Sequence, residues 1–309
     1  MSDFLPQLLQ QLFNGLSLGA IYALIAIGYT MVYGIIGMIN FAHGEIYMIG
    51  AYVGLVTLSA VGVQSGLPVW LVIALMLIVA VLVTAVYGYV IEQLAYKPLR
   101  DSPRLVPLIS AIGMSIFLQN WMALGQGARD MAVPALIPGA MRFGGEGGGF
   151  EIFIPYARVL VIAVTVVLMV LLTLYIRNSR MGRASRACSQ DMHMANLLGI
   201  DTNRVISFTF ILGAMLAAVG GILIALAVGK LNPFIGFIAG IKAFTAAVLG
   251  GIGSVPGAML GGVILGVAET LAAAYISSEY KDIVAFALLV LILMFRPTGL
   301  LGKPEVEKV

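Results

Sequence analysis

The sequence has very little charge. Of its 309 residues only 10% are Asp, Glu, Lys or Arg, whereas 61% are apolar. Soluble domains carry about 25% charged residues, and so few charges could not cover a folded surface in water. Disorder is excluded as well, because disordered chains are low in hydrophobicity. The apolar residues come in long uncharged runs, so the sequence predicts that lipid is the solvent.

Residues that would support catalysis or cofactor binding are also scarce. The single Cys188 excludes an internal disulfide, and a lone thiol in a polar loop is expected to be inert. The two histidines lie on different segments, so no cluster has the spacing of a metal site. A G-x-x-x-x-G-K-[ST] phosphate loop is absent. We therefore expect no enzyme, no bound metal and no bound cofactor, and the net charge of +3 without a basic stripe argues against nucleic acid.

The uncharged windows predict an all-α, polytopic membrane helix bundle. A membrane helix needs about 20 apolar residues, so the longer windows must be divided at turn signals such as residues 62–68 and 250–254. This gives nine crossings, with eight as the alternative. The expected spans are residues 12–36, 44–61, 67–91, 105–124, 156–177, 204–228, two short helices within 231–268, and 279–295.

Basic residues predict the orientation of the bundle. Most of the 17 Lys and Arg residues lie in segments 92–104 and 177–204 and in the C-terminal tail. Lys and Arg in short loops favour the cytoplasmic side, which is expected here to be that of a bacterial inner membrane. The loop 125–155 is then outside. No basic residue precedes Lys97, so an outside N-terminus is expected, together with a cytoplasmic C-terminus.

A short pattern occurs twice. Gly37, Asn40 and Gly44 recur with the same spacing as Gly229, Asn232 and Gly236, at the ends of two spans that run in opposite directions. Inverted repeats with broken helices are typical of transporters, although two unrelated helix breaks would give the same pattern. The expected single unit, 1–309, has a first repeat at about 12–124, a linking span at 156–177, a loop at 178–203, a second repeat at about 204–296 and a tail at 297–309.

Four ionisable residues are expected in or beside spans. Burying a charge in lipid costs at least ~2.5–3.5 kcal/mol, so such residues are candidates for a transport path. An ion pair that holds helices together, Lys242 with either Glu269 or Glu45, explains them equally well, and the sequence does not choose. With the two asparagines of the repeated pattern, the substrate-path candidates are Asn40, His43, Glu45, Asn232, Lys242 and Glu269.

The loop 178–203 predicts a short amphipathic helix around residues 184–198. Gly199 suits the end of this helix, and Asp201 or Thr202 can cap the next span. Flanking arginines allow two roles, resting on anionic lipid or docking in a groove of a soluble partner. The residues expected near one face are Ala184, Ala187, Cys188, Met194, Ala195 and Leu198.

Several motifs resemble those of permease subunits of branched-chain amino-acid ABC importers. The resemblance extends along the whole chain and is most specific near the N-terminus. It is closest to the type that forms the first of two paired permease subunits. The matching stretches are NGLSLGAIYAL at 14–24, GIIGMINFAHGE at 34–45, the loop segment 182–200, KAFTAAVLGGIGS at 242–254 and RPTGL at 296–300.

The resemblance implies a complex whose subunits have different functions. A second homologous permease would complete the pathway, two cytoplasmic ATPases would use ATP and Mg, and an external binding protein would deliver leucine, isoleucine or valine for alternating access. Many ABC importers have Glu-Ala-Ala in the coupling loop where this chain has Arg186-Ala187-Cys188. The ATPase-coupling candidates are Arg183, Arg186, Ala187, Asp191, Ala195, Leu198 and Gly199.

Two other functions fit the same residues. One is a urea or short-amide ABC importer permease, since relatives of this family carry such substrates and a binding protein would set the specificity. The other is an ion-coupled carrier that acts without an ATPase and uses Glu45, Lys242 and Glu269 as a relay.

Overall fold

The chain folds into the helical membrane bundle that the sequence predicts. The computed structural model describes residues 4–62, 66–100, 102–103, 105–144 and 151–302. Within those ranges the helices are α1 (Phe4–Ile36), α2 (His43–Val61), α3 (Val69–Ile91), α4 (Leu105–Gln126), α5 (Tyr156–Asn178), α6 (Arg180–Gln190), α7 (Met192–Leu197), α8 (Thr202–Val228), α9 (Ile235–Gly250), α10 (Val255–Tyr275) and α11 (Lys281–Phe295). After α3 the chain continues as a π-helix, η1 (Glu92–Tyr96), and a 3-10 turn, η2 (Lys97–Leu99).

Length divides the apolar helices into two groups. Among the described residues seven helices are long and apolar enough to cross a membrane: α1, α2, α3 with its continuation, α4, α5, α8 and α10. The two remaining expected crossings, the seventh and ninth along the chain, are α9 and α11, which have 16 and 15 residues. At 1.5 Å per residue these two extend only about 24 and 22 Å, less than the roughly 30 Å of a lipid core.

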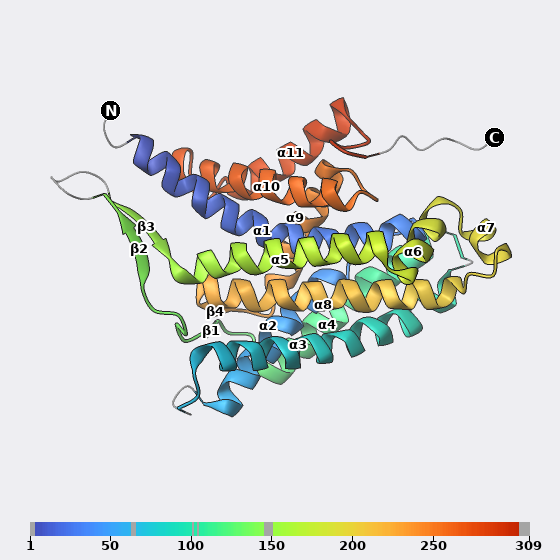
Figure 1. Ribbon diagram of the computed structural model, residues 1–309, viewed down its shortest axis with the longest axis horizontal. Coiled ribbons are helices and arrows are strands. Elements are labelled where there is room, and N and C mark those ends of the chain that lie inside the picture. The colour runs from blue at the N-terminus through green and yellow to red at the C-terminus, as the bar shows by residue number, and fades with distance from the viewer. Residues whose placement is uncertain (1–3, 63–65, 101, 104, 145–150, 303–309) are drawn as a thin grey trace.

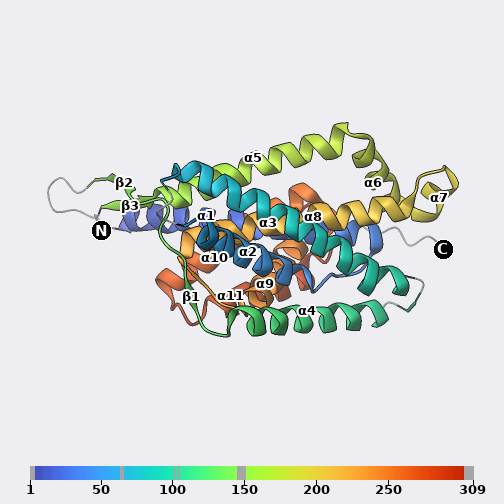
Figure 2. The same ribbon diagram turned by 90° about the horizontal axis from the view of Figure 1, so that it is seen from below.

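Three helices form the centre of the bundle. Across their most apolar stretches α1, α2 and α8 are mostly buried, whereas α3, α4 and α5 are mostly exposed. Figures 1 and 2 show α3, α4 and α5 along the outside of this centre. Their exposed side chains are large and apolar, for example Ile78, Leu82 and Val86 on α3. An apolar surface of this extent suits lipid rather than water.

Glycines allow α1 and α10 to pack with their backbones in contact. A Cβ atom on Gly19 would overlap Val263 of α10, and one on Gly266 would overlap Gly19 of α1. Gly15 and Gly19 also flank Ser17 in a G-x-S-x-G pattern. A nucleophile elbow needs a strand-to-helix turn, but these residues lie within α1. The glycines therefore serve helix packing, which drives association in lipid.

Short strands, which the sequence analysis did not expect, lie at one end of the bundle. Strand β1 (Met131–Ala132) pairs antiparallel with β4 (Lys230–Leu231), and β2 (Ala140–Phe143) pairs antiparallel with β3 (Ile152–Pro155). Figure 1 shows them at the opposite end from α6 and α7. We call these the strand end and the α7 end. The side chain of Gln10 forms two hydrogen bonds with the backbone of Phe153, which fastens α1 to β3.

The α1–α10 contact gives a testable prediction. Gly266→Ala places a methyl group against the backbone of Gly19, so we expect a loss of about 1–3 kcal/mol in stability, the usual cost of overpacking. Thermal unfolding of the purified protein in detergent measures the change. Gly113→Ala on α4 is the matched control, because a Cβ there meets no atom within 4 Å. Equal melting temperatures for the two variants would contradict this account of the contact.

Candidate functional site

The two breaks expected from the repeated pattern share their local geometry. Gly37 follows α1 with φ of +70°, and Gly229 follows α8 with φ of +74°. Each donates its backbone N–H to the carbonyl four residues earlier. After each break, an asparagine carbonyl accepts a hydrogen bond from the first backbone N–H of the next helix: His43 of α2 donates to Asn40, and Ile235 of α9 donates to Asn232. The two breaks therefore have the same local geometry, and the internal repeat stays a prediction.

The N-termini of α2 and α9 meet inside the bundle. A Cβ on Gly44 would overlap the backbone of Gly236, and a Cβ on Gly236 would overlap the Gly44 carbonyl. Both helix starts carry partial positive charge. The first turn of α2 also holds Glu45, whose Oε2 lies against Gly236. A carboxylate is therefore located where two helix N-termini converge, which is a favourable position for a negative charge.

The residues around this junction are buried and only partly hydrogen-bonded. Glu45 accepts a 3.0 Å hydrogen bond from the Ser115 hydroxyl of α4 through Oε1, while its Oε2 has no partner among the described residues. The ring of His43 lies 4.9 Å from that of Tyr29, and its Nε2 is likewise unpartnered in the described part of the chain. We call Asn40, His43, Glu45 and Gly236 the break site.

The two asparagines of the pattern have different surroundings. Asn40 is buried and accepts a 2.8 Å hydrogen bond from the Tyr96 hydroxyl of η1. Asn232 is only partly buried, and its side chain accepts from the backbone N–H of Phe234, two residues later. Asn40 is therefore connected to another element, while Asn232 stabilises its own turn.

Lys242 and Glu269 belong to a separate ionic cluster. Lys242 of α9 lies 2.6 Å from Glu269 of α10 and 2.6 Å from Asp282 of α11, and the Tyr22 hydroxyl of α1 donates to Glu269 at 2.9 Å. Of the two ion pairs that the sequence left open, the structure forms the one with Glu269. Glu45 is bonded to Ser115 instead. Asp282 is not predictable as a partner from the sequence, where it falls only at the start of the expected span 279–295.

The coupling segment is two helices rather than the single helix expected at 184–198. Asp191 has an extended backbone, and its side chain accepts a 2.9 Å hydrogen bond from the N–H of Met194, so it caps α7 and separates it from α6. Asp side chains compete in this way with helix continuation. The predicted common face is therefore wrong: Cys188 and Ala195 are buried, whereas Met194 and Leu198 are exposed.

Most of the predicted coupling residues stabilise the segment itself. Arg183 donates to the carbonyl of Asn178, and Arg186 donates to the carbonyls of Ile176 and Arg177, which are acceptors at the C-terminus of α5. Ala187 is partly buried against the core, and burial raises the pKa of the neighbouring Cys188 thiol.

An exposed apolar patch remains on α7 and just after it. Its residues are Met194, 54% exposed, Leu197, 69% exposed, and Leu198, 76% exposed. We call these three residues the α7 patch. Gly199, with φ of +82°, ends the segment, and Asp201 caps α8 by accepting from the N–H of Arg204. Leu197 was absent from the predicted coupling residues because the expected helix continued through Asp191.

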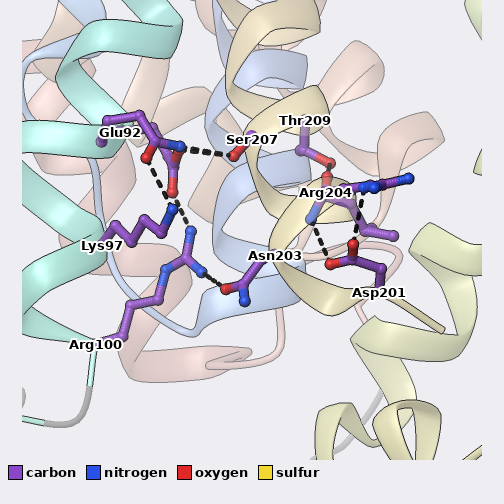
Figure 3. A network of polar contacts seen from close by, with 10 residues as sticks. Glu92, Lys97, Arg100, Asp201, Asn203, Arg204, Ser207 and Thr209 are labelled. Carbon is purple, nitrogen blue, oxygen red and sulfur yellow. Dashed lines mark hydrogen bonds and ion pairs between the residues drawn. The ribbon is translucent and has the colours of Figure 1, made fainter. Parts of the chain in front are cut away.

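A polar network at the α7 end was not predicted (Figure 3). Glu92 of η1 is fully buried, pairs with Arg100, and accepts a 2.7 Å hydrogen bond from Ser207 of α8. Arg100 also donates to Asn203 of α8. The sequence analysis treated Glu92 as part of a charged loop, because it follows the last residue of the predicted span directly.

Comparison with known proteins identifies relatives along the whole chain. A family model described as "Branched-chain amino acid transport system / permease component" matches residues 11–293. The high-affinity branched-chain amino acid transport system permease protein LivH of Salmonella typhimurium is 57% identical over 309 residues, covering both chains completely. BraD of Pseudomonas aeruginosa, with the corresponding description, is 56% identical over 97% of this chain and 98% of its own. The permease protein LivM of Salmonella typhimurium is 28% identical over 91% of this chain and 68% of its own.

The ionic cluster leads to a prediction about stability. Lys242→Met leaves the buried carboxylate of Glu269 without its cation, so we expect a loss of about 3–5 kcal/mol. Adding Glu269→Gln removes the uncompensated charge and keeps an acceptor for Tyr22, so the double variant should regain much of the stability. Unfolding in detergent, analysed as a double-mutant cycle, measures this coupling. A Lys242→Met protein that is as stable as the wild type but does not transport would instead place Lys242 on the substrate path.

Proposed function

Because the chain belongs to the family of branched-chain amino acid transport system permease components, we propose that it is one of two permease subunits of an ATP-driven importer of leucine, isoleucine and valine. The observation that carries this proposal is the full-length identity of 57% with a protein described as a high-affinity permease for these substrates. The weaker similarity to LivM supports pairing of two homologous permeases, since LivH and LivM are both described as permease proteins of such a high-affinity system.

The charge distribution supports an orientation in the bacterial inner membrane. The α7 end carries Lys97, Arg100, Arg183, Arg186 and Arg204, which the positive-inside rule assigns to the cytoplasm. At the strand end Arg142 pairs with Glu151, which leaves less net charge there. In this orientation the C-terminus is cytoplasmic and the N-terminus is external. An external binding protein would dock at the strand end.

The α7 patch is the proposed contact with an ATPase. Large exposed apolar patches on a polar face mark sites of protein contact. Two cytoplasmic ATPases would bind ATP and Mg, because the sequence has no phosphate loop of its own. Movement of the ATPases would act on α7 and change the access of the pathway from one side of the membrane to the other.

The break site is the proposed region of this subunit that controls the path. Broken helices whose N-termini face one another recur at transporter binding sites, and the unpartnered atoms of Asn40, His43 and Glu45 offer polar contacts to a zwitterion. The ionic cluster has a different proposed role. Because Lys242 is neutralised by Glu269 and Asp282, these three residues serve to hold α9, α10 and α11 together.

Reconstitution tests the overall proposal. The chain is purified with its second permease and the ATPases and reconstituted into vesicles. ATP is supplied on the side of the membrane where the ATPases lie, and the binding protein is supplied on the other side. Leucine uptake that requires both ATP and the binding protein is expected. Uptake by this chain alone, driven by an ion gradient, would refute the importer and favour a carrier.

The ATPase contact gives a more local prediction. Leu198→Asp places a charge in the α7 patch, where desolvating it against a partner is unfavourable, so we expect ATP-driven uptake to fall about tenfold or more. The matched control is Leu301→Asp, an exposed leucine that follows α11 and lies outside the α7 patch, for which uptake should be unchanged. The amount of ATPase that co-purifies with each variant is measured alongside uptake. Full ATPase retention and uptake in Leu198→Asp would refute the contact.

A further inference from the structure

A chain of contacts runs from the coupling segment to the break site through residues that neither the sequence analysis nor the proposed function uses. It starts at the first turns of α8, which follow α7 after four residues. There Asn203 accepts from Arg100, and Ser207 donates to Glu92 at 2.7 Å. These contacts join α8 to η1, the irregular helix that ends α3 (Figure 3).

The ion pair at the centre of this chain is buried. Glu92 is fully buried, and the Arg100 side chain is 14% exposed. Separating such a pair leaves an uncompensated charge in a medium of low dielectric constant, so the two residues move together. A π-helix in place of a regular helix often marks a functional position. The network therefore ties η1 firmly to the first turns of α8.

The same π-helix reaches the break site through Tyr96. Its ring packs against Phe210 of α8, with centroids 5.1 Å apart, and its hydroxyl donates a 2.8 Å hydrogen bond to Asn40. The carbonyl of Asn40 in turn accepts from the N–H of His43, the first residue of α2. Tyr96 thus joins α8 to the start of the helix that carries Glu45.

A cavity beside this chain leaves room for movement. Its volume is about 540 Å³, and its walls come from the end of α1, the connection between α3 and α4, α7 and the start of α8. Met192 of α7 and Met38 of the break face the same space. In this region a cavity separates α7 from the break, and the polar contacts of Glu92 and Tyr96 pass beside it.

We propose that Glu92 and Tyr96 are positioning residues that transmit displacement of the coupling segment to the break before α2. When α7 moves the first turns of α8, the Glu92 network moves η1, and the Tyr96 hydroxyl moves Asn40 and the start of α2. This inference rests on the proposed ATP-driven import, because only a moving partner would displace α7. It names a specific route between the ATPase contact and the break site.

The test separates the ATPase cycle from transport in the complete reconstituted complex. Tyr96→Phe removes one hydroxyl and keeps the ring on Phe210, so leucine taken up per ATP hydrolysed should fall about 2- to 10-fold, while binding-protein-stimulated hydrolysis continues. Glu92→Gln removes a charge that Arg100 requires, so its loss of uptake per ATP should be larger, about tenfold or more.

The control variant removes a buried hydroxyl of the same segment that lies outside the route. Thr84 of α3 is buried and bonds only to carbonyls of its own helix, so Thr84→Val should keep the wild-type ratio of uptake to hydrolysis. The amount of assembled complex is measured for every variant by size-exclusion chromatography.

Each possible outcome either supports or overturns the proposed role of Glu92 and Tyr96. An assembled Tyr96→Phe complex with the wild-type ratio would overturn the inference, as would an equal fall in Thr84→Val. Loss of assembly in Tyr96→Phe, with hydrolysis and uptake falling together, would show a structural role and would also overturn it. If the wild-type complex has no ATP-dependent uptake, the proposed function fails first, and that result is distinct from the failure of a variant.

Discussion

The N-termini of α2 and α9 meet at Gly44 and Gly236, and this contact sets the arrangement of the rest of the bundle. Lipid provides no hydrophobic force between helices, so close packing and internal hydrogen bonds must hold them together. Because neither residue has a side chain, two helix starts of like polarity come into backbone contact. Glu45 lies against this junction, where the partial positive charges of both helix ends favour a carboxylate. Any larger residue here would separate α2 from α9 and expose the carboxylate.

Around this junction the buried polar groups fall into three clusters. The ionic cluster of Lys242, Glu269 and Asp282 joins α9, α10 and α11, whereas the Glu92 network joins η1 to α8. Both consist of paired groups. Each of these two clusters leaves one buried atom without a hydrogen bond among the described residues, Asp282 Oδ1 and Arg100 Nε, whereas the break site leaves three, on Glu45, His43 and Asn40. Incomplete hydrogen bonding of buried groups is costly in a purely structural site, so this difference favours the break site as the place where polar ligands pass.

The sequence predicts the helices well because its uncharged windows correspond directly to membrane spans. It places α2 through α5 and α8 within two residues of their observed bounds, whereas α1 begins eight residues before its expected start at residue 12. It does not predict features that depend on contacts between distant segments. The strands β1 and β4 are two residues each, too short for a pattern, and form only because Met131 and Leu231 are brought together. Helix packing likewise determines that Lys242 pairs with Glu269 and not with Glu45. Glu92 follows a predicted span in the sequence and reads as a loop residue, whereas the fold buries it.

The position of the helix break at Asp191 determines how the coupling segment can act. α6 is held to α5 by the arginine contacts, and Gly182 packs directly on Ile176. α7 presents the exposed patch and is connected to α8 by Gly199 and by the hydrogen bond from Ile200 to the carbonyl of Ala195. A continuous helix would have tied the patch to α5, the peripheral span. Because α6 and α7 both contact α8, a force on α7 also passes to α8, which packs against α1 and α2 in the centre of the bundle and against α3 outside it.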